Sequence, residues 1–251
     1  MPATKIPGPG IKTKKRKMKR LTLFFIVLFA SFSITAQEKK VDIYGSFSLE
    51  MIFSFAAIDN QGNTDGNIMR WAPVINPQSM LNVDFGKNFG LFSGLAIRNV
   101  GFIYEDPFDE NNAKYKYRTY NFGIPVGFKV GKLNDIVFFG GYEMEFPFVY
   151  KEKQFINEEK ENKDVIWFSN RVEAFQQSLL AGIQVPYGFT VKFKYYLSNF
   201  HNRDYVAMVD GQETYPYDFK SNVIYFSLAW NVFTNWKEME PKKWEKKAEL
   251  R

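Results

Sequence analysis

The sequence contains no cysteine, which excludes disulfides, thiolate metal sites and anchoring through a lipid-modified cysteine. It contains one histidine, His201, so any histidine-dependent chemistry has to use that residue. Long apolar runs are also missing. The stretch Leu21–Ile34 falls short of the roughly twenty apolar residues that a membrane-spanning helix needs. We therefore predict no metal ion, no other cofactor and no helical membrane anchor.

Acidic residues are absent from the first 36 positions, which hold eight Lys or Arg residues. The rest of the chain contains 25 of the 33 basic residues and all 27 acidic ones. Its net charge is therefore about −2, whereas the formal charge of the whole chain is +6. A nucleic-acid-binding protein keeps its positive charge in its folded part. The charge distribution thus predicts that nucleic acid is not a partner.

The first 36 residues have the pattern of a secretory signal peptide. A basic cluster at positions 14–20 precedes the apolar stretch Leu21–Ile34, and the small residue Ala36 precedes Gln37. A basic segment, a short apolar core and a small residue at the cut are the three parts of such a signal. We predict a signal peptide over residues 1–36, with Met18 as an alternative start.

Aromatic residues are abundant, at 18% of the chain. Two ranges, Arg118–Gly131 and Ile136–Tyr150, alternate apolar residues with polar or small ones. Side chains of a strand point to opposite faces with period two, so each range is predicted to be a strand with one oily face. Because only four residues join the two ranges, they are predicted to form an antiparallel hairpin.

The same alternation recurs in six further ranges, which brings the predicted strands to eight. Connections between them alternate strictly between long and short along the chain. The further predicted strands are Val41–Phe55, Met80–Phe85, Phe89–Tyr104, Arg171–Val185, Phe189–Leu197 and Asn222–Phe233. The long connections are Asp59–Pro77, Glu105–Tyr117, Lys151–Asn170 and Ser198–Lys220.

This alternation of connections is typical of a barrel in the outer membrane, where short turns face the periplasm and long loops face outside. Backbone groups cannot stay unpaired in lipid, so the sheet has to close on itself. We predict an all-β fold, an eight-stranded antiparallel up-and-down transmembrane β-barrel over residues 37–233. A charged periplasmic tail is predicted over residues 234–251. Outer-membrane lipid is then the first partner, and the barrel is expected to be a monomer.

The face opposite the apolar one carries charges of both signs. Eight strands leave an interior just wide enough for side chains to fill, so these charges are predicted to pair across the lumen and plug it. Lys129 and Glu143, on adjacent strands, are expected to pair directly. The predicted lumen charges are Glu50, Asp84, Glu143 and Glu145 with Arg98, Lys129, Lys192 and Lys194. An exported soluble lipocalin-like barrel is the alternative, but it needs an apolar interior and a polar exterior.

The leader ending in Thr35-Ala36-Gln37, the eight alternating strands and the strand Tyr120–Gly131 resemble small outer-membrane β-barrel proteins of the OmpA/OmpX and PorT-like type. The resemblance covers residues 37–233. It implies a place in the outer membrane of a Gram-negative bacterium. It also implies a structural role or a role in surface contact, with a protein partner at the long loops or at the periplasmic tail.

Some barrels of this kind modify the acyl chains of lipids, a chemistry that needs a nucleophile, a base and an orienting acid within hydrogen-bond reach. His201 lies in a predicted loop between Ser198 and Asp204. A lone histidine in a polar, Asn-rich loop is usually solvated, and loops position catalytic groups poorly. We therefore predict a non-enzymatic protein without catalytic residues, with an outer-membrane acyl hydrolase or transferase as the alternative.

Overall fold

The computed structural model describes residues 41–73, 76–105, 113–133, 135–209 and 211–234. The predicted signal peptide and the predicted tail beyond residue 234 lie outside the described residues. None of the helices in the described part of the chain is long and apolar enough to cross a membrane.

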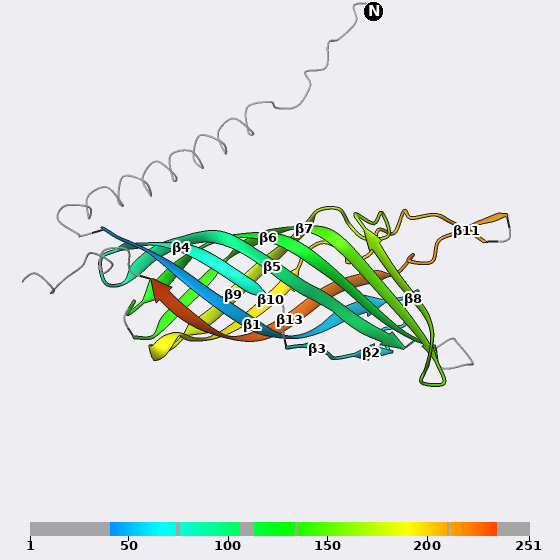
Figure 1. Ribbon diagram of the computed structural model, residues 1–251, viewed down its shortest axis with the longest axis horizontal. Helices are drawn as coiled ribbons and strands as arrows, with labels where there is room; N and C mark the ends of the chain where they lie inside the picture. The colour runs from blue at the N-terminus through cyan, green and yellow to red at the C-terminus, as the bar shows by residue number, and fades with distance from the viewer. Residues whose placement is uncertain (1–40, 74–75, 106–112, 134, 210, 235–251) are drawn as a thin grey trace, which may run out of the picture. The chain divides into compact units, whose positions relative to one another are not determined.

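Eight strands form a closed antiparallel ring (Figure 1). Each strand pairs with the next, and the last pairs with the first over Gly45–Asp59, so the ring has no unpaired edge. The predicted fold class is confirmed. In chain order the ring strands are β1 (Val41–Asp59), β4 (Pro77–Phe85), β5 (Phe89–Glu105), β6 (Lys114–Gly131), β7 (Val137–Ile156), β9 (Gln176–Gln184), β10 (Phe189–Tyr196) and β13 (Lys220–Thr234).

The connections divide by length between the two ends of the barrel. Short turns join β4 to β5, β6 to β7 and β9 to β10, the last through the 3-10 turn η1 (Pro186–Gly188). The long connections meet at the opposite end, on the right in Figure 1. They carry the short strands β2 (Asn67–Ile68), β3 (Arg70–Ala72), β8 (Glu159–Trp167), β11 (Ala207–Val209) and β12 (Gln212–Thr214).

One long connection is more ordered than predicted. Strand β7 continues to Ile156 and pairs with β8, so most of Lys151–Asn170 is a charged β-hairpin rather than a loop. Its sequence is dominated by Lys, Glu and Asn and lacks the apolar period of two that marks the barrel strands. The hairpin therefore gave no strand signal.

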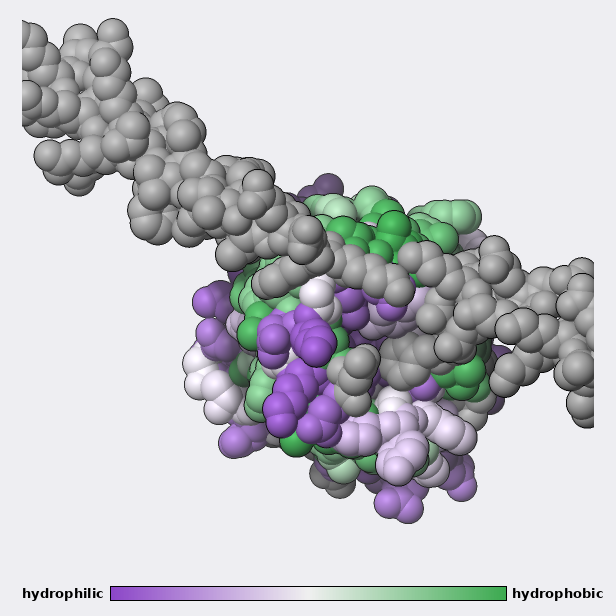
Figure 2. All heavy atoms as spheres, turned by 90° about the vertical axis from the view of Figure 1, so that its left-hand side faces the viewer, coloured by the Kyte–Doolittle hydropathy of each residue, from purple (hydrophilic) through white to green (hydrophobic). Residues whose placement is uncertain are grey.

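The wall of the barrel separates apolar from polar side chains. Outward-facing residues such as Phe138 (60% exposed) and Leu95 (54%) are apolar, whereas Arg98 and Glu143, on the same strands, point inward and are fully buried. Seen from the short-turn end, hydrophilic residues gather over the end of the barrel and hydrophobic ones edge its sides (Figure 2).

A β-bulge interrupts the alternation of β7. Tyr120 of β6 faces Val149 and Asn121 faces Pro147, which leaves Phe148 as an extra residue. Because one extra residue shifts every following side chain to the other face, Tyr150 points inward although it is even-numbered like the outward Phe146.

Candidate functional site

The structure places all eight predicted lumen charges inside the ring, with exposures between 0% and 7%. They fall into two groups. Six form a cluster in the middle of the barrel, here called the lumen network, and the other two lie nearer the short turns. The lumen network consists of Glu50, Glu143 and Glu145 with Arg98, Lys192 and Lys194.

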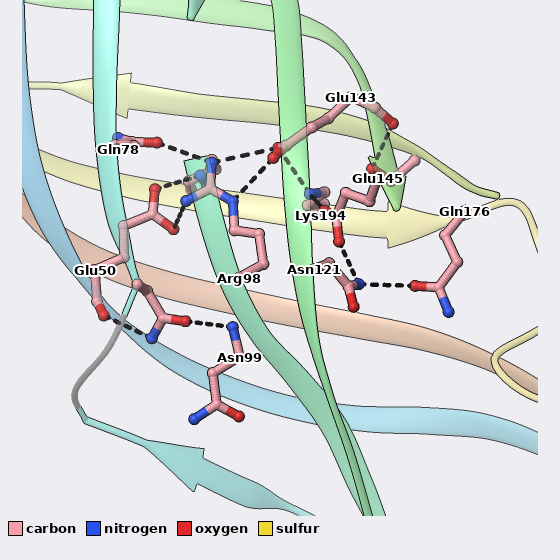
Figure 3. Close-up of polar contacts among 12 residues, drawn as sticks. Glu50, Gln78, Arg98, Asn99, Asn121, Glu143, Glu145, Gln176 and Lys194 are labelled. Carbon is pink, nitrogen blue, oxygen red and sulfur yellow. Dashed lines mark hydrogen bonds and ion pairs between the residues drawn. The ribbon is translucent and has the colours of Figure 1, made fainter. Parts of the chain in front are cut away.

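Arg98 is the centre of the lumen network (Figure 3). Its Nη1 lies 3.1 Å from Glu50 Oε2, and its Nε donates to Glu143 Oε1 at 2.9 Å. Its Nη2 also donates to Gln78 Oε1 at 2.9 Å. The planar guanidinium thus connects β1, β4 and β7 from its place on β5. A buried charge is tolerated only when it is paired and hydrogen-bonded, and Arg98 meets both conditions.

Two lysines of β10 complete the network. Lys194 Nζ lies 2.7 Å from Glu143 Oε2 and also contacts Glu145, while Lys192 contacts Glu50. Glu145 accepts further hydrogen bonds from Tyr196 Oη at 2.8 Å and Asn121 Nδ2 at 2.7 Å. Three acids therefore face three bases, and strands on opposite sides of the ring are tied through the lumen.

The remaining two charges form a separate pair near the short turns. Lys129 Nζ lies 2.7 Å from Asp84 Oδ1 and donates to Tyr44 Oη at 2.7 Å. The expected pair of Lys129 with Glu143 is wrong. In the register of β6 with β7, Lys129 faces Phe139 and Glu143 faces Pro125, four residues or about 13 Å away along β6.

Rings rather than charges fill the barrel toward the long loops. Seven aromatic residues, here called the aromatic plug, come from three strands of the barrel and from the connection between β10 and β13. All are at most 6% exposed. The aromatic plug consists of Phe102, Tyr117, Tyr150, Phe200, His201, Tyr217 and Phe219.

His201 lies at the centre of this plug and is fully buried, so the prediction of a solvated histidine is wrong. Its ring stacks on Tyr217 and meets the edge of Tyr117, each with 4.4 Å between ring centroids. The loop folds inward because Phe200 N–H donates to the Ser221 carbonyl and His201 forms a bridge with Val172. Sequence position alone could not show this inward fold.

The environment of His201 does not fit a catalytic base. Burial lowers the pKa of His201 to about 3, so the ring is neutral at pH 7. Its Nε2 lies 3.5 Å from Tyr150 Oη, and its Nδ1 has no hydrogen-bond partner among the described residues. Ser198 Oγ instead accepts from Gln177 N–H at 3.0 Å, and Asp204 N–H donates to the Asn202 side chain. No triad is assembled in the described part of the chain.

Glu152 borders the plug on the long-loop side. Its Oε2 accepts from Tyr217 Oη at 2.7 Å and from Tyr150 Oη at 2.9 Å, and it lies 3.2 Å from Arg171 Nη1. Arg171 also pairs with Asp164 at 2.8 Å. These contacts fix the tyrosine rings and link the plug to the β7–β8 hairpin.

Two pockets lie at the long-loop end, and Tyr217, Pro216 and Glu152 border both. One, of about 390 Å³, reaches toward Arg171 and the β11 hairpin. The other, of about 260 Å³, is rich in tyrosine. Its lining includes Tyr104, Tyr115, Tyr117, Tyr215 and Asp218. Among the described residues no group of three or more His, Asp or Glu side chains is arranged to hold a metal ion.

No family model and no curated protein sequence matches the chain. Solved structures do. The chain is similar to small outer-membrane β-barrels. One is Ail, the attachment invasion locus protein of Yersinia pestis, in complex with the heparin analogue sucrose octasulfate, with 12% identity, a TM-score of 0.35 and coverage of 76% of this chain and 99% of Ail.

Two further solved structures are similar to this chain to about the same degree. Neisserial surface protein A has 7% identity, a TM-score of 0.36 and coverage of 77% of this chain and 99% of its own. OprG from Pseudomonas aeruginosa has 10% identity, a TM-score of 0.35 and coverage of 76% and 96%. Because these scores are low, the barrel architecture rests on the strand pairings of the chain itself.

Proposed function

We propose that the chain is a sealed, non-enzymatic integral protein of the outer membrane of a Gram-negative bacterium. It acts structurally or through contact with a partner at its long-loop end. The observation that carries this proposal is the reversal of polarity relative to a soluble protein: apolar residues cover the outside of the ring, and paired charges fill the inside. A soluble lipid carrier of lipocalin type requires the opposite arrangement.

The height of the apolar wall supports a membrane location. On β6 the outward residues are apolar or aromatic from Val130 to Tyr120. Ten rises of about 3.3 Å along a strand tilted by about 45° correspond to roughly 23 Å across the membrane. The apolar band of outer-membrane barrels is about 25 Å tall. A closed ring also satisfies the backbone in lipid, where an open edge would not.

Two layers across the lumen support the proposal that the barrel is sealed. The lumen network occupies the middle, and the aromatic plug occupies the end near the long loops. Purified protein in planar bilayers should give only small, infrequent currents, and a steady large conductance would refute the sealed barrel. The double variant Tyr117→Ala/Tyr217→Ala should raise the frequency of openings. Tyr187→Ala, at an exposed tyrosine of the short-turn end, is the matched control and should not.

Orientation is tested by labelling intact cells. An epitope inserted at Gly62 or Asn162, both exposed at the long-loop end, should be reached by antibody. The same epitope at Asp135, in the turn between β6 and β7, should be reached only after the outer membrane is permeabilised. The reverse labelling would overturn the proposed orientation. If the tagged protein were found in the soluble fraction, with the epitopes at both ends equally accessible to antibody, the membrane location would be overturned.

We place the contact surface for a partner at the two pockets beside Tyr217. Tyrosine is a frequent anchor at binding surfaces because its ring is large and its hydroxyl is polar. Tyr215 is 54% exposed and borders the smaller pocket. A photoreactive residue at Tyr215 should cross-link to a defined partner in intact cells, and one at Tyr187 on the opposite end should not. Equal cross-linking from both positions would argue against a contact surface at the long loops.

A further inference from the structure

The outward face of β6, β7 and β8 changes from apolar to basic toward the long loops. On β6 the change falls between Tyr120 and Arg118, and on β7 it falls at the bulge before Lys151. Lys151 Nζ lies 4.9 Å from the centre of the Tyr120 ring, so the lysine sits directly above the aromatic edge of the apolar wall. This basic surface is here called the basic wall. It consists of Lys116, Arg118, Lys151, Lys153 and Lys163.

Like charges lie directly opposite one another in the basic wall. In the register of the sheet, Lys116 of β6 faces Lys153 of β7, and Lys153 faces Lys163 of β8. One row nearer the membrane, Arg118 faces Lys151. Like-charged side chains opposite one another destabilise a sheet, and ordinary surface strands avoid the arrangement. A row of three lysines therefore needs a counter-charge from elsewhere.

The described residues do not supply that counter-charge. None of the ion pairs among them includes a residue of the basic wall, and the Arg118 Nε atom is buried without a hydrogen-bond partner. Two acids of the neighbouring hairpin, Glu152 and Asp164, point the other way and pair with Arg171. Partial burial, and then the charges of Arg118, Arg70 and Lys153, lower the pKa of Lys116.

A pocket of about 230 Å³ adjoins the basic wall on the same outward face. Ile103 and Phe155 give it an apolar lining, and the Lys114 and Lys116 side chains border it. Glu158 is the one acid in its lining, so cationic groups still outnumber anionic ones around it. The pocket is therefore an apolar hollow beside ammonium and guanidinium groups, at the edge of the apolar wall nearest the long loops. This combination suits a ligand that is both anionic and apolar.

We propose that the basic wall binds the phosphorylated headgroup of a lipid in the outer leaflet of the membrane. This inference rests on the proposed function, because the wall faces that leaflet only if the long loops point outward. Phosphate is matched to the wall because Arg offers a planar pair of donors and Lys a compact positive charge. A lipid is favoured over free phosphate because the cations lie where the apolar wall ends, and a bound headgroup leaves its acyl chains against that wall.

The test compares two double variants that lose the same charge. Lys116→Gln/Lys153→Gln removes two opposed lysines of the basic wall. Lys87→Gln/Lys132→Gln removes two exposed lysines at the short-turn end and is the matched control. Each protein is folded into vesicles of phosphatidylcholine alone, or with added lipid A, a diphosphorylated glycolipid. Retained lipid A is counted by native mass spectrometry, and the midpoint of thermal unfolding is measured in both vesicles.

Wild type and control should retain lipid A and unfold at a higher temperature in its presence. The wall variant should bind it roughly tenfold or more weakly, since each cation near an anionic surface contributes to attraction. In phosphatidylcholine alone the wall variant should unfold no earlier than wild type, because repulsion has been removed. A misfolded variant would fail this second measurement, so it cannot imitate loss of binding.

Three results would overturn the inference. The first is equal retention of lipid A by wild type and wall variant. The second is equal retention of dephosphorylated lipid A, which would assign binding to the acyl chains alone. The third is equal stabilisation by inorganic phosphate, which would assign the site to free anions. If the protein fails to insert into either vesicle, the proposed function itself fails, and this outcome is distinguishable by protease protection before any lipid is counted.

Discussion

The middle of the barrel and its long-loop end are both filled, but by opposite means. In the middle, six charged side chains neutralise one another, and each depends on partners from other strands. At the long-loop end, seven rings pack together with few hydrogen bonds. A charged network is specific but fails when one member is lost, because its partners are left buried and unpaired. A cluster of rings loses contacts in proportion to the atoms removed.

The largest effect is expected from Glu143→Leu in the lumen network. This change leaves Arg98 and Lys194 each short of a partner, and breaking a buried pair from one side costs about 3–5 kcal/mol. Urea unfolding of vesicle-embedded protein measures the loss. Glu143→Gln, which keeps hydrogen-bonding oxygen but no charge, should fall between wild type and Glu143→Leu. Equal stability of all three would mean that the network does not hold the barrel.

A similar or slightly smaller loss is expected from Phe102→Ala in the aromatic plug. Phe102 is fully buried and contacts Tyr117, Phe200 and His201. Removing its ring should cost about 3 kcal/mol, and Phe102→Leu should recover most of that loss. The graded series Phe, Leu, Ala is read in the same urea assay. If Phe102→Leu were as damaging as Phe102→Ala, the plug would depend on ring geometry rather than on packed volume.

Acid is expected to weaken the long-loop end selectively. His201 has its pKa lowered by burial from 6.5 to about 3 in the folded protein. Between these values only the unfolded state binds the extra proton, so stability present above pH 6.5 is lost as the pH falls. From pH 7 to pH 5 the contribution is about 2 kcal/mol. Comparing urea midpoints at the two pH values, His201→Phe should show that much less pH dependence. An unchanged dependence would place the titration elsewhere.

The smallest effect is expected at an exposed ion pair. Arg203 and Asp218 lie 2.6 Å apart, but their side chains are 46% and 61% exposed. Solvent screens such pairs, so Arg203→Ala should change the free energy of unfolding by about 0.5 kcal/mol or less. Together with Glu143→Leu, this variant separates burial from mere pairing. A loss as large as that of Glu143→Leu would remove the basis for the comparison between the two regions.

The sequence predicted the barrel well because one period governs both its shape and its solvent exposure. Alternation along β6 and β7 indicated which residues face inward, and the alternating connections indicated closure. The register between neighbouring strands was harder to predict. Lys129 and Glu143 were expected to pair because their strands are neighbours, but a difference of four residues along β6 separates them. That two strands are neighbours does not determine which of their residues lie opposite one another. This depends on the turn between them and on the stagger of the strands around the whole ring.

The aromatic plug was not predicted, and the reasons are physical. Tyr150 turns inward although Phe146, an even number of residues before it, faces outward, and the single-residue bulge that causes this carries no clear signal in one sequence. His201 and Phe200 lie in a polar connection whose inward fold depends on backbone contacts with Ser221 and Val172. Such contacts join segments distant in sequence, and local pattern does not encode them.

The bulge at Phe148 has a consequence for how this chain tolerates insertion and deletion. Beyond it, Tyr150 and Glu152 turn into the barrel, while Lys151 and Lys153 turn out toward the surroundings. Deleting Phe148 would remove the bulge and leave the pairing with β6 unchanged on both sides, with Tyr150 opposite Thr119 and Lys151 opposite Arg118. Tyr150 and Glu152 would therefore stay inside the barrel and the lysines outside. A deletion in the regular part of β7 would instead put the following side chains out of phase with their partners on β6.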